Sequence, residues 1–209
     1  MLGLSRILIT AGATREYIDD LRFITNPASG KLGIAIADEA LARGYDVIFI
    51  HGAIACDLPK TKCVEAITSK DMLNAVLDNI HDCNAAIFTA AVTDFKPIAK
   101  FEGKLDSNHS ITIKLKPTEK IIDKAREANR NAFFVACKAE FDKKKMIQEA
   151  IDMINKNKAD LVVANHAKWM ARDSIEAYII NKNKRIRKVV GSKKDLAREI
   201  LNYLELGSK

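Results

Sequence analysis

The residues best suited to chemistry lie in one polar stretch, TAGATREYIDDLRFITNPASGKLG (10–33), which follows a short apolar run. Gly12 comes directly after that run, and Ser29-Gly30-Lys31 opens a helical pattern with Gly33 one turn in. Small residues let the backbone approach a phosphate, and the free amides at a helix start favour negative charge. Arg15, Arg22 and Lys31 add positive charge. The stretch therefore predicts an anion-binding loop.

The stretch matches neither of the common phosphate-loop patterns. It contains no G-x-x-x-x-G-K-[ST] and no G-x-G-x-x-G. An ordinary strand–loop–helix connection is the alternative interpretation. The length of the loop and its density of small and charged residues favour a functional site.

Three further polar segments follow apolar runs: TAAVTD (89–94), CKAEF (137–141) and Asn165-His166. In open parallel sheets, ligands bind beyond the carboxyl ends of the strands. We therefore expect these segments to converge with the 10–33 loop. The four histidines have no carboxylate or cysteine partner at a telling spacing, so we expect surface or core roles for them.

The elements that must position these segments alternate between strands and helices. Nearly continuous apolar runs, as in strands buried on both faces, occur at 6–10, 46–51, 85–91, 132–137 and 159–165. Helical patterns lie between them, at 31–43, 70–80, 143–156 and 193–204, with Asp142 and Ser192 as N-caps. This alternation predicts an α/β fold: a Rossmann-like, mostly parallel sheet with helices on both faces.

Two segments depart from the alternation. Residues 92–116 carry little helical pattern and one alternating strand, ITIKLK, and such a long excursion is typical of a functional or interface element. Residues 176–190 predict a C-terminal hairpin. Seven basic residues fall between Lys182 and Lys194, but no aromatic residues interleave with them, which favours a solvated hairpin over a nucleic-acid surface.

Composition excludes several classes. The chain has 209 residues, 48% hydrophobic and 29% charged, and a net charge of +7 that suits an anionic ligand. No apolar run approaches the ~20 residues that span a bilayer, and Arg6 interrupts the only candidate for a signal peptide. The four cysteines lack zinc-ligand spacing and are typical of reduced thiols. We expect one cytoplasmic domain over 1–209, without membrane or nucleic-acid partners.

Several motifs, in order, resemble the phosphopantothenate–cysteine ligase family of coenzyme A biosynthesis. They are ITAGATREYID (9–19), RFITNPASGKLG (22–33), AAVTDFKP (90–97), EGK (102–104), LKPTEKII (115–122) and DLVVAN (160–165). The resemblance covers almost the whole chain. It implies that a nucleoside triphosphate, with Mg²⁺, activates the carboxylate of 4′-phosphopantothenate as an acyl nucleotidylate and releases pyrophosphate. The amine of cysteine then displaces the nucleoside monophosphate.

The resemblance also implies roles for individual residues. Asn26 and Lys104 are the implied catalytic residues: Asn26 contacts the reacting carboxyl group, and Lys104, on a flexible flap, promotes turnover of the intermediate. Asn26, Ala90 and Asp94 are implied to bind the substrate. The implied nucleotide-binding residues are Gly12, Arg22, Ser29, Gly30, Gly33, Ala90, Ala91, Asp94, Cys137 and Asn165. The ligands of the metal ion stay unassigned. Family members are dimers, in which an arm such as 92–116 reaches the partner.

The chain departs from the family pattern at several positions. Asp106 and Ser107 stand where many bacterial members have further lysines, and Cys137 stands where a phenylalanine usually stacks on the base. Bacterial members use CTP and animal members ATP; Lys138 and Glu140 match the animal pattern, whereas the compact length favours CTP, which we expect. Prokaryotic members are often fused to a flavin-dependent decarboxylase. We therefore expect this chain to be either a stand-alone ligase or one half of such a bifunctional protein, with the decarboxylase as its partner or fused domain.

A nicotinamide-dependent oxidoreductase is the rival enzyme class on this fold. Tyr178-x-x-x-Lys182 has the catalytic spacing of short-chain dehydrogenases. That spacing needs a helix to place both side chains on one face, whereas this segment alternates like a strand.

Overall fold

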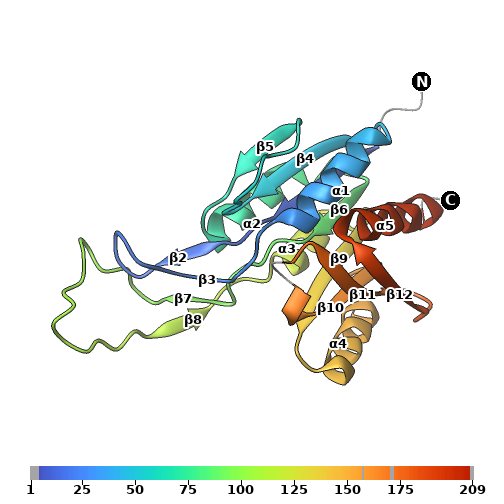
Figure 1. The fold of residues 1–209 in the computed structure, drawn as a ribbon. Helices are drawn as coiled ribbons and strands as arrows, with labels where there is room; N and C mark the ends of the chain where they lie inside the picture. Colours follow the sequence, from blue (N-terminus) through green and yellow to red (C-terminus); the bar gives the residue numbers. More distant parts are fainter. Residues whose placement is uncertain (1–4, 157, 170–171, 208–209) are drawn as a thin grey trace.

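The central feature of the molecule is an eight-stranded sheet (Figure 1). The computed structural model describes residues 5–156, 158–169 and 172–207, so the ends and two short gaps of the predicted 1–209 domain lie outside it. The sheet order is β12-β11-β10-β9-β6-β1-β4-β5. Its strands are β1 (Arg6–Ala11), β4 (Asp46–His51), β5 (Lys62–Glu65), β6 (Ala85–Phe88), β9 (Phe133–Glu140), β10 (Leu161–His166), β11 (Ser174–Asn181) and β12 (Ile186–Ser192).

The six strands from β5 to β10 are parallel, and the hairpin β11–β12 continues the sheet in antiparallel fashion. From β1 the chain adds β4 and β5 on one side, then returns to add β6, β9 and β10 on the other. Strand order therefore reverses between β1 and β6. Such a reversal opens a crevice at the carboxyl ends of the two strands, which is where ligands bind in open α/β sheets.

Helices cover both faces of the sheet, as predicted. α1 (Lys31–Ala42) and α5 (Lys193–Gly207) lie on one face, whereas α2 (Ser69–Asn79), α3 (Ile121–Ala128) and α4 (Lys143–Asn155) lie on the other (Figure 1). Alternate residues of β1 show the two layers: Ile7 and Ile9 pack toward α1, and Leu8 packs toward α2. Burial on both faces explains why the strands are continuous apolar runs.

The predicted helix caps are confirmed. The Asp142 carboxylate accepts a 2.7 Å hydrogen bond from the Lys145 amide at the start of α4. Ser192 and Asp195 exchange hydrogen bonds in a capping box at the start of α5. The sequence did not predict α3, which is short and mostly polar, or the edge strand β5.

Two thin arms extend from the carboxyl edge of the sheet (Figure 1). One is the antiparallel pair β2 (Arg15–Tyr17) and β3 (Phe23–Thr25), and the other is β7 (Phe95–Pro97) with β8 (Leu115–Pro117). The arms lie side by side, and the Phe101 amide donates to the Ile18 carbonyl at 2.9 Å. The second arm is the predicted 92–116 excursion, although only the end of the expected ITIKLK strand is paired.

None of the helices in the described residues combines the length and apolar character needed to cross a membrane. All four cysteines are free thiols.

Candidate functional site

The turns that follow β1 and β6 are joined directly to each other. The Ala91 amide donates to the Gly12 carbonyl at 2.8 Å, and Ala13 forms bridges to both Ala53 and Ala91. The 10–33 loop and the TAAVTD turn therefore meet at the crevice between β1 and β6, as the sequence predicted.

Close packing explains the glycines of the loop. A Cβ on Gly33 would lie 2.4 Å from the Ala11 Cβ and 2.7 Å from Thr89 Oγ1, so only glycine lets α1 approach the two strands. Gly30, at the N-cap of α1, has a left-handed φ of 76°, which glycine adopts without strain. With no side-chain cap and no acidic residue in the first turn, the α1 amides face the crevice with their positive dipole end.

A cavity of about 160 Å³ lies in front of this helix start. It is lined by segments that the sequence separates widely: the end of the 10–33 loop, the β6 turn, β9, and the end of β10. Seven predicted nucleotide-binding residues line it: Ser29, Gly30, Gly33, Ala90, Ala91, Cys137 and Asn165. Gly12 lies just behind, with its amide nitrogen 3.4 Å from where a Cβ of Gly30 would stand.

Neither Asn26 nor Asp94 is part of the lining of this cavity. The Asn26 amide group donates to the carbonyls of Ala91 at 3.4 Å and Val92 at 3.2 Å, which fixes it on the β6 turn. Asp94 is exposed and forms an ion pair of 2.5 Å with Lys120. Asn26 is thus placed where its amide could face a substrate, whereas Asp94 is held by a lysine of its own chain.

Arg22 and Lys104 lie on the arms, away from the cavity lining. The Arg22 guanidinium donates to the Asp19 carboxylate at 2.7 Å and to the Leu105 carbonyl at 3.0 Å. Arg22 therefore joins the two arms. It does not line the cavity, whereas Ser29, Gly30 and Gly33, the other residues predicted to hold the triphosphate, do. Lys104 is exposed in the second arm, between Gly103 and Leu105.

Both neighbours of Lys104 are fixed to the first arm. The Gly103 amide donates to the Asp20 carboxylate at 2.8 Å, and the Leu105 amide donates to the Asp19 carboxylate at 3.0 Å. The hydrogen bond from the Arg22 amide, with those from Leu105 and Leu21, lowers the pKa of the Asp19 carboxyl well below its usual range. An ionised Asp19 thus anchors the segment that carries Lys104.

Some lining residues were not predicted from the sequence. Lys193, the first residue of α5, is only 7% exposed and lines the cavity. Burial, and next the charge of Lys31, lower the pKa of Lys193 below its usual value. Ile175, in β11, also lines the cavity. No sequence pattern marks Lys193, because a lysine after a capping serine is typical of a solvated helix start.

The chemistry of the lining favours binding over covalent catalysis. Burial raises the pKa of Cys137 to about 12, so its thiol stays protonated and is a poor nucleophile. The described residues contain no group of three or more histidines, cysteines and carboxylates that could hold a metal ion. A lining of glycine, alanine and backbone amides, with cations beside it, suits an anionic ligand that brings its own metal ion.

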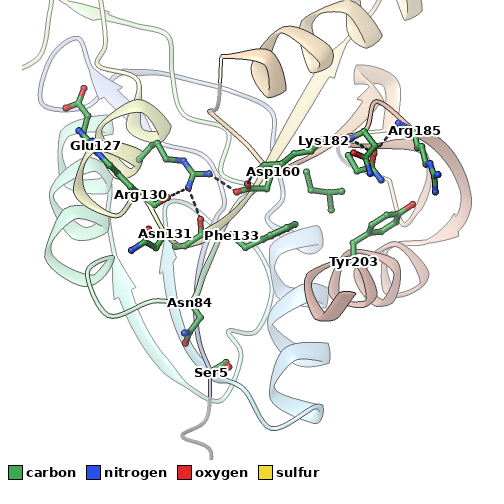
Figure 2. A pocket seen from close by; sticks show the side chains of 15 residues that line it. Ser5, Asn84, Glu127, Arg130, Asn131, Phe133, Asp160, Lys182, Arg185 and Tyr203 are labelled. Carbon is green, nitrogen blue, oxygen red and sulfur yellow. Dashed lines mark hydrogen bonds and ion pairs between the residues drawn. The ribbon is translucent and has the colours of Figure 1, made fainter. Parts of the chain in front are cut away.

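A larger cavity, of about 1420 Å³, lies at the opposite, amino-terminal edge of the sheet (Figure 2). At its centre the buried Asp160 carboxylate pairs with Arg126 at 2.7 Å and with Lys182, and accepts the Phe134 amide at 2.7 Å. Burial would raise the pKa of Asp160, but these hydrogen bonds lower it. The charges at its centre are satisfied by one another, so we assign this network to the fold.

The structure contradicts the Tyr178-x-x-x-Lys182 motif on which the oxidoreductase alternative rests. Tyr178 lies in β11 and Lys182 in the hairpin turn, so the two do not share a helix face. The Tyr178 hydroxyl donates to Glu176 at 3.0 Å, and Lys182 is paired with Asp160 at the amino edge. Ion pairs also hold Arg187 to Glu199 and Lys188 to Glu176, as expected for a solvated hairpin.

Comparison with known proteins identifies a matching family and several similar proteins. The family model described as "DNA/pantothenate metabolism flavoprotein C-terminal domain" matches residues 2–206. The coenzyme A biosynthesis bifunctional protein CoaBC of Thermococcus kodakarensis is 34% identical over 204 residues, which cover 96% of this chain and 51% of that protein. The chain spans about half the length of the curated relatives it matches.

Two solved structures have the same fold. The crystal structure of the C-terminal domain of CoaBC superposes with a TM-score of 0.83 at 31% identity, and covers 97% of this chain and 94% of that one. The DNA/pantothenate metabolism flavoprotein from Streptococcus pneumoniae gives a TM-score of 0.85 at 26% identity, with 97% and 99% coverage. These matches confirm the predicted α/β fold and the predicted family.

Proposed function

Because the chain belongs to the DNA/pantothenate metabolism flavoprotein C-terminal domain family, we propose that it is a phosphopantothenate–cysteine ligase, with one nucleotide-binding domain over 1–209. The observation that carries the proposal is the cavity at the β1/β6 reversal, where Ser29, Gly30 and Gly33 meet Ala90 and Ala91. The names of the relatives, which assign them to coenzyme A biosynthesis, support the same pathway for this chain.

The proposed reaction has two steps. A carboxylate oxygen of 4′-phosphopantothenate attacks the α-phosphorus of the nucleotide, and pyrophosphate leaves. The cysteine amine then attacks the carbonyl carbon of the acyl nucleotidylate, the nucleoside monophosphate leaves, and the nitrogen loses a proton. The first step brings two anions together, so catalysis depends on oriented donors and cations more than on a nucleophilic side chain.

The placement of each residue supports a division of roles. The α1 amides, with Gly12, Ser29, Gly30 and Gly33, would hold the phosphates. Asn26, fixed against the Ala91 and Val92 carbonyls, would orient the reacting carboxyl group, with Ala90 and Asp94 beside it. Asn165 and Cys137 also line the cavity and would contact the rest of the nucleotide. Magnesium would be bound mainly by phosphate oxygens and, when bound, would help to neutralise the charge of the phosphates.

Lys104 would act across a dimer interface. Its arm extends away from the sheet (Figure 1), and Lys104 does not line the cavity of its own chain. The two arms expose several large apolar side chains, as is typical of an interface. They are Leu21, Phe23, Phe95, Ile98, Phe101, Ile111 and Leu115. Pairing of two copies through the arms would cover these residues and bring Lys104 to the partner's cavity. We therefore propose a homodimer.

CTP is the proposed nucleotide, and ATP is the alternative. The two residues that match the ATP-using pattern are engaged within the chain: Lys138 pairs with Glu149 at 2.8 Å, and Glu140 pairs with Lys145 at 2.9 Å. Because both side chains are engaged in ion pairs, we assign neither a role in recognising the base. We also place the reaction in the cytoplasm, where free thiols persist, and a decarboxylase acting on the product is the expected partner or fused domain.

Product formation tests the proposal. The chain is incubated with 4′-phosphopantothenate, cysteine and Mg²⁺, with CTP, ATP, GTP or UTP in parallel, and 4′-phosphopantothenoylcysteine is measured by mass spectrometry. We expect product with CTP above the other three. Product with none of the four, together with a thermal shift by NADPH alone, would instead favour the oxidoreductase class.

A further inference from the structure

We propose that Thr14, Thr93 and Glu16 form a network that positions Asn26 for the acyl-activation step. The three side chains are buried, with exposed fractions of 0%, 3% and 6% respectively. None of them lines the cavity, so they act through Asn26 and are positioning residues. The inference rests on the proposed function, because that function assigns Asn26 to the reacting carboxyl group.

Thr14 connects the two segments that fix Asn26. Its hydroxyl oxygen accepts the Thr93 amide at 2.9 Å, which holds the turn after β6. In the same turn, the Val92 carbonyl accepts the side-chain amide of Asn26 at 3.2 Å. The Thr14 carbonyl accepts the hydroxyl of Thr25, the residue before Asn26, at 2.7 Å. The backbone that carries Asn26 and the turn that orients its side chain are therefore both attached to Thr14.

The hydroxyl groups of the network have a defined direction. Glu16 Oε1 accepts the Thr93 hydroxyl at 3.3 Å. Because this bond uses the only hydroxyl proton of Thr93, Thr14 is the donor in the 3.2 Å contact between the two hydroxyl oxygens. The chain of hydrogen bonds thus runs from Thr14 through Thr93 to a carboxylate. Buried hydrogen bonds that polarise one another in this way hold their groups in one arrangement.

Glu16 anchors the network to α2. Its Oε1 atom also accepts the Ser69 amide at 2.7 Å, at the start of this helix, where the helix dipole favours negative charge. A glutamate is rarely buried to this extent, and an apolar residue would fill the same space at lower cost. The buried carboxylate therefore indicates a need to fix Thr93, and with it the turn that orients Asn26.

The orientation of Asn26 is what this network would control. Strand β3 ends at Thr25 and α1 begins at Lys31, so hydrogen bonds rather than a helix or strand set the position of Asn26. The first step of the proposed reaction brings two anions together, and its rate depends on the alignment of the reacting atoms. A small displacement of Asn26 should therefore slow the reaction even if the nucleotide still binds.

Two matched variants and a control test the proposal. Thr14→Val keeps the shape of the side chain and removes the hydroxyl, whereas Thr14→Ser keeps the hydroxyl. Thr61→Val is the control, because the Thr61 hydroxyl donates to the Val47 carbonyl at 2.5 Å, near the amino-terminal end of β4. Each variant is made in the wild type and in Asn26→Ala. Single-turnover pyrophosphate release, CTP affinity by calorimetry and thermal unfolding without ligand are measured.

In Thr14→Val we expect pyrophosphate release to slow on the order of tenfold to a hundredfold, with a smaller change in CTP affinity. Thr14→Ser should recover most of the rate. Thr61→Val should release pyrophosphate at the wild-type rate, although it also loses a hydrogen bond. In Asn26→Ala, adding Thr14→Val should have little further effect, because the group that Thr14 positions is gone.

Two results would overturn the inference. One is an unchanged rate of pyrophosphate release in Thr14→Val. The other is an equal loss of rate with and without the Asn26 side chain, as a purely structural role of Thr14 predicts. A wild-type chain that releases no pyrophosphate with CTP or ATP would instead contradict the proposed function itself.

A second variant keeps the test decisive if Thr14→Val does not fold. Glu16→Gln keeps the size of the side chain but makes it a neutral, weaker acceptor for the Thr93 hydroxyl. Pyrophosphate release should slow more in the wild-type background than in Asn26→Ala. An unchanged rate, or an equal loss in the two backgrounds, would overturn the proposal.

Discussion

Asp19 and Leu105 lie 86 residues apart, yet the Asp19 carboxylate accepts a 3.0 Å hydrogen bond from the Leu105 amide. Arg22 completes the contact, because its guanidinium binds both the Asp19 carboxylate and the Leu105 carbonyl. The loop that begins at the candidate site thereby also positions the segment that carries Lys104. The 10–33 loop thus contains one proposed catalytic residue, Asn26, and positions the segment that carries the other, Lys104.

Loss of the Asp19 charge should loosen this segment. In Asp19→Asn the carboxylate that accepts the Leu105, Leu21 and Arg22 amides becomes a neutral, weaker acceptor. We expect hydrogen exchange at Leu105 to accelerate on the order of tenfold, with the global melting temperature changed less. Asp106→Asn, an exposed change in the same arm, is the control. Equal exchange in both variants would contradict the anchoring role.

The lowered pKa of Asp19 also predicts a pH dependence. A carboxyl group whose pKa is lower in the folded state stabilises that state fully above its unfolded pKa of ~3.9, and the stabilisation is lost as pH falls toward the folded pKa. The protection factor of Leu105 should therefore fall below about pH 4, by at most tenfold per pH unit. Asp19→Asn should lack this dependence. A wild-type protection factor that stays flat from pH 6 to pH 2.5 would refute it.

Asn26→Asp should block the first half-reaction. The aspartate cannot donate to the Ala91 and Val92 carbonyls, and its charge would oppose the substrate carboxylate. We expect pyrophosphate release to fall on the order of 10²- to 10³-fold, as for loss of an oriented donor in other acyl-transfer sites. Asn183→Asp, in the distant hairpin turn, should retain activity. Normal release in Asn26→Asp would remove this residue from the mechanism.

Lys104→Gln should separate the two half-reactions. Because the proposed role of Lys104 is in turnover of the intermediate and not in holding the triphosphate, we expect the first burst of pyrophosphate to persist while the acyl nucleotidylate accumulates. Rapid quenching followed by mass spectrometry would detect the intermediate. Lys114→Gln, an exposed lysine on the same arm, should behave as the wild type. Cysteine ligation at the wild-type rate in Lys104→Gln would reject the role.

Gly33→Ala should destabilise the fold. Alanine in a helix is favoured over glycine by ~1 kcal/mol, but the added Cβ would lie 2.4 Å from the Ala11 Cβ and 2.7 Å from Thr89 Oγ1. Overpacking of this kind costs about 1–3 kcal/mol, so we expect a net loss in urea unfolding. Adding Ala11→Gly should recover part of it. A more stable Gly33→Ala protein would show that α1 has room to move.

The parallel core could be predicted from the sequence because its strands are buried on both faces. Runs such as 46–51 and 159–165 contain the continuous apolar pattern that this burial requires, and their ends mark the functional edge. α1, α2, α4 and α5 were equally predictable from their apolar spacing and caps.

The arms and part of the site could not be predicted in this way. β2 and β3 are three-residue strands stabilised by contacts with the other arm, and such contacts leave no periodic pattern. Arg22 looked like a phosphate ligand because its charge is visible in the sequence, whereas its partner Leu105 is not. Lys193 enters the site only because α5 begins beside α1, a tertiary relationship that local sequence does not encode.

Single-turnover pyrophosphate release tests the central claim most directly. The chain is mixed with CTP and Mg²⁺, with and without 4′-phosphopantothenate and in the absence of cysteine, and pyrophosphate is quantified. Acyl activation predicts release close to one equivalent per site only when 4′-phosphopantothenate is present, with the acyl nucleotidylate held on the protein. Release without 4′-phosphopantothenate, or no release until cysteine is added, would contradict it.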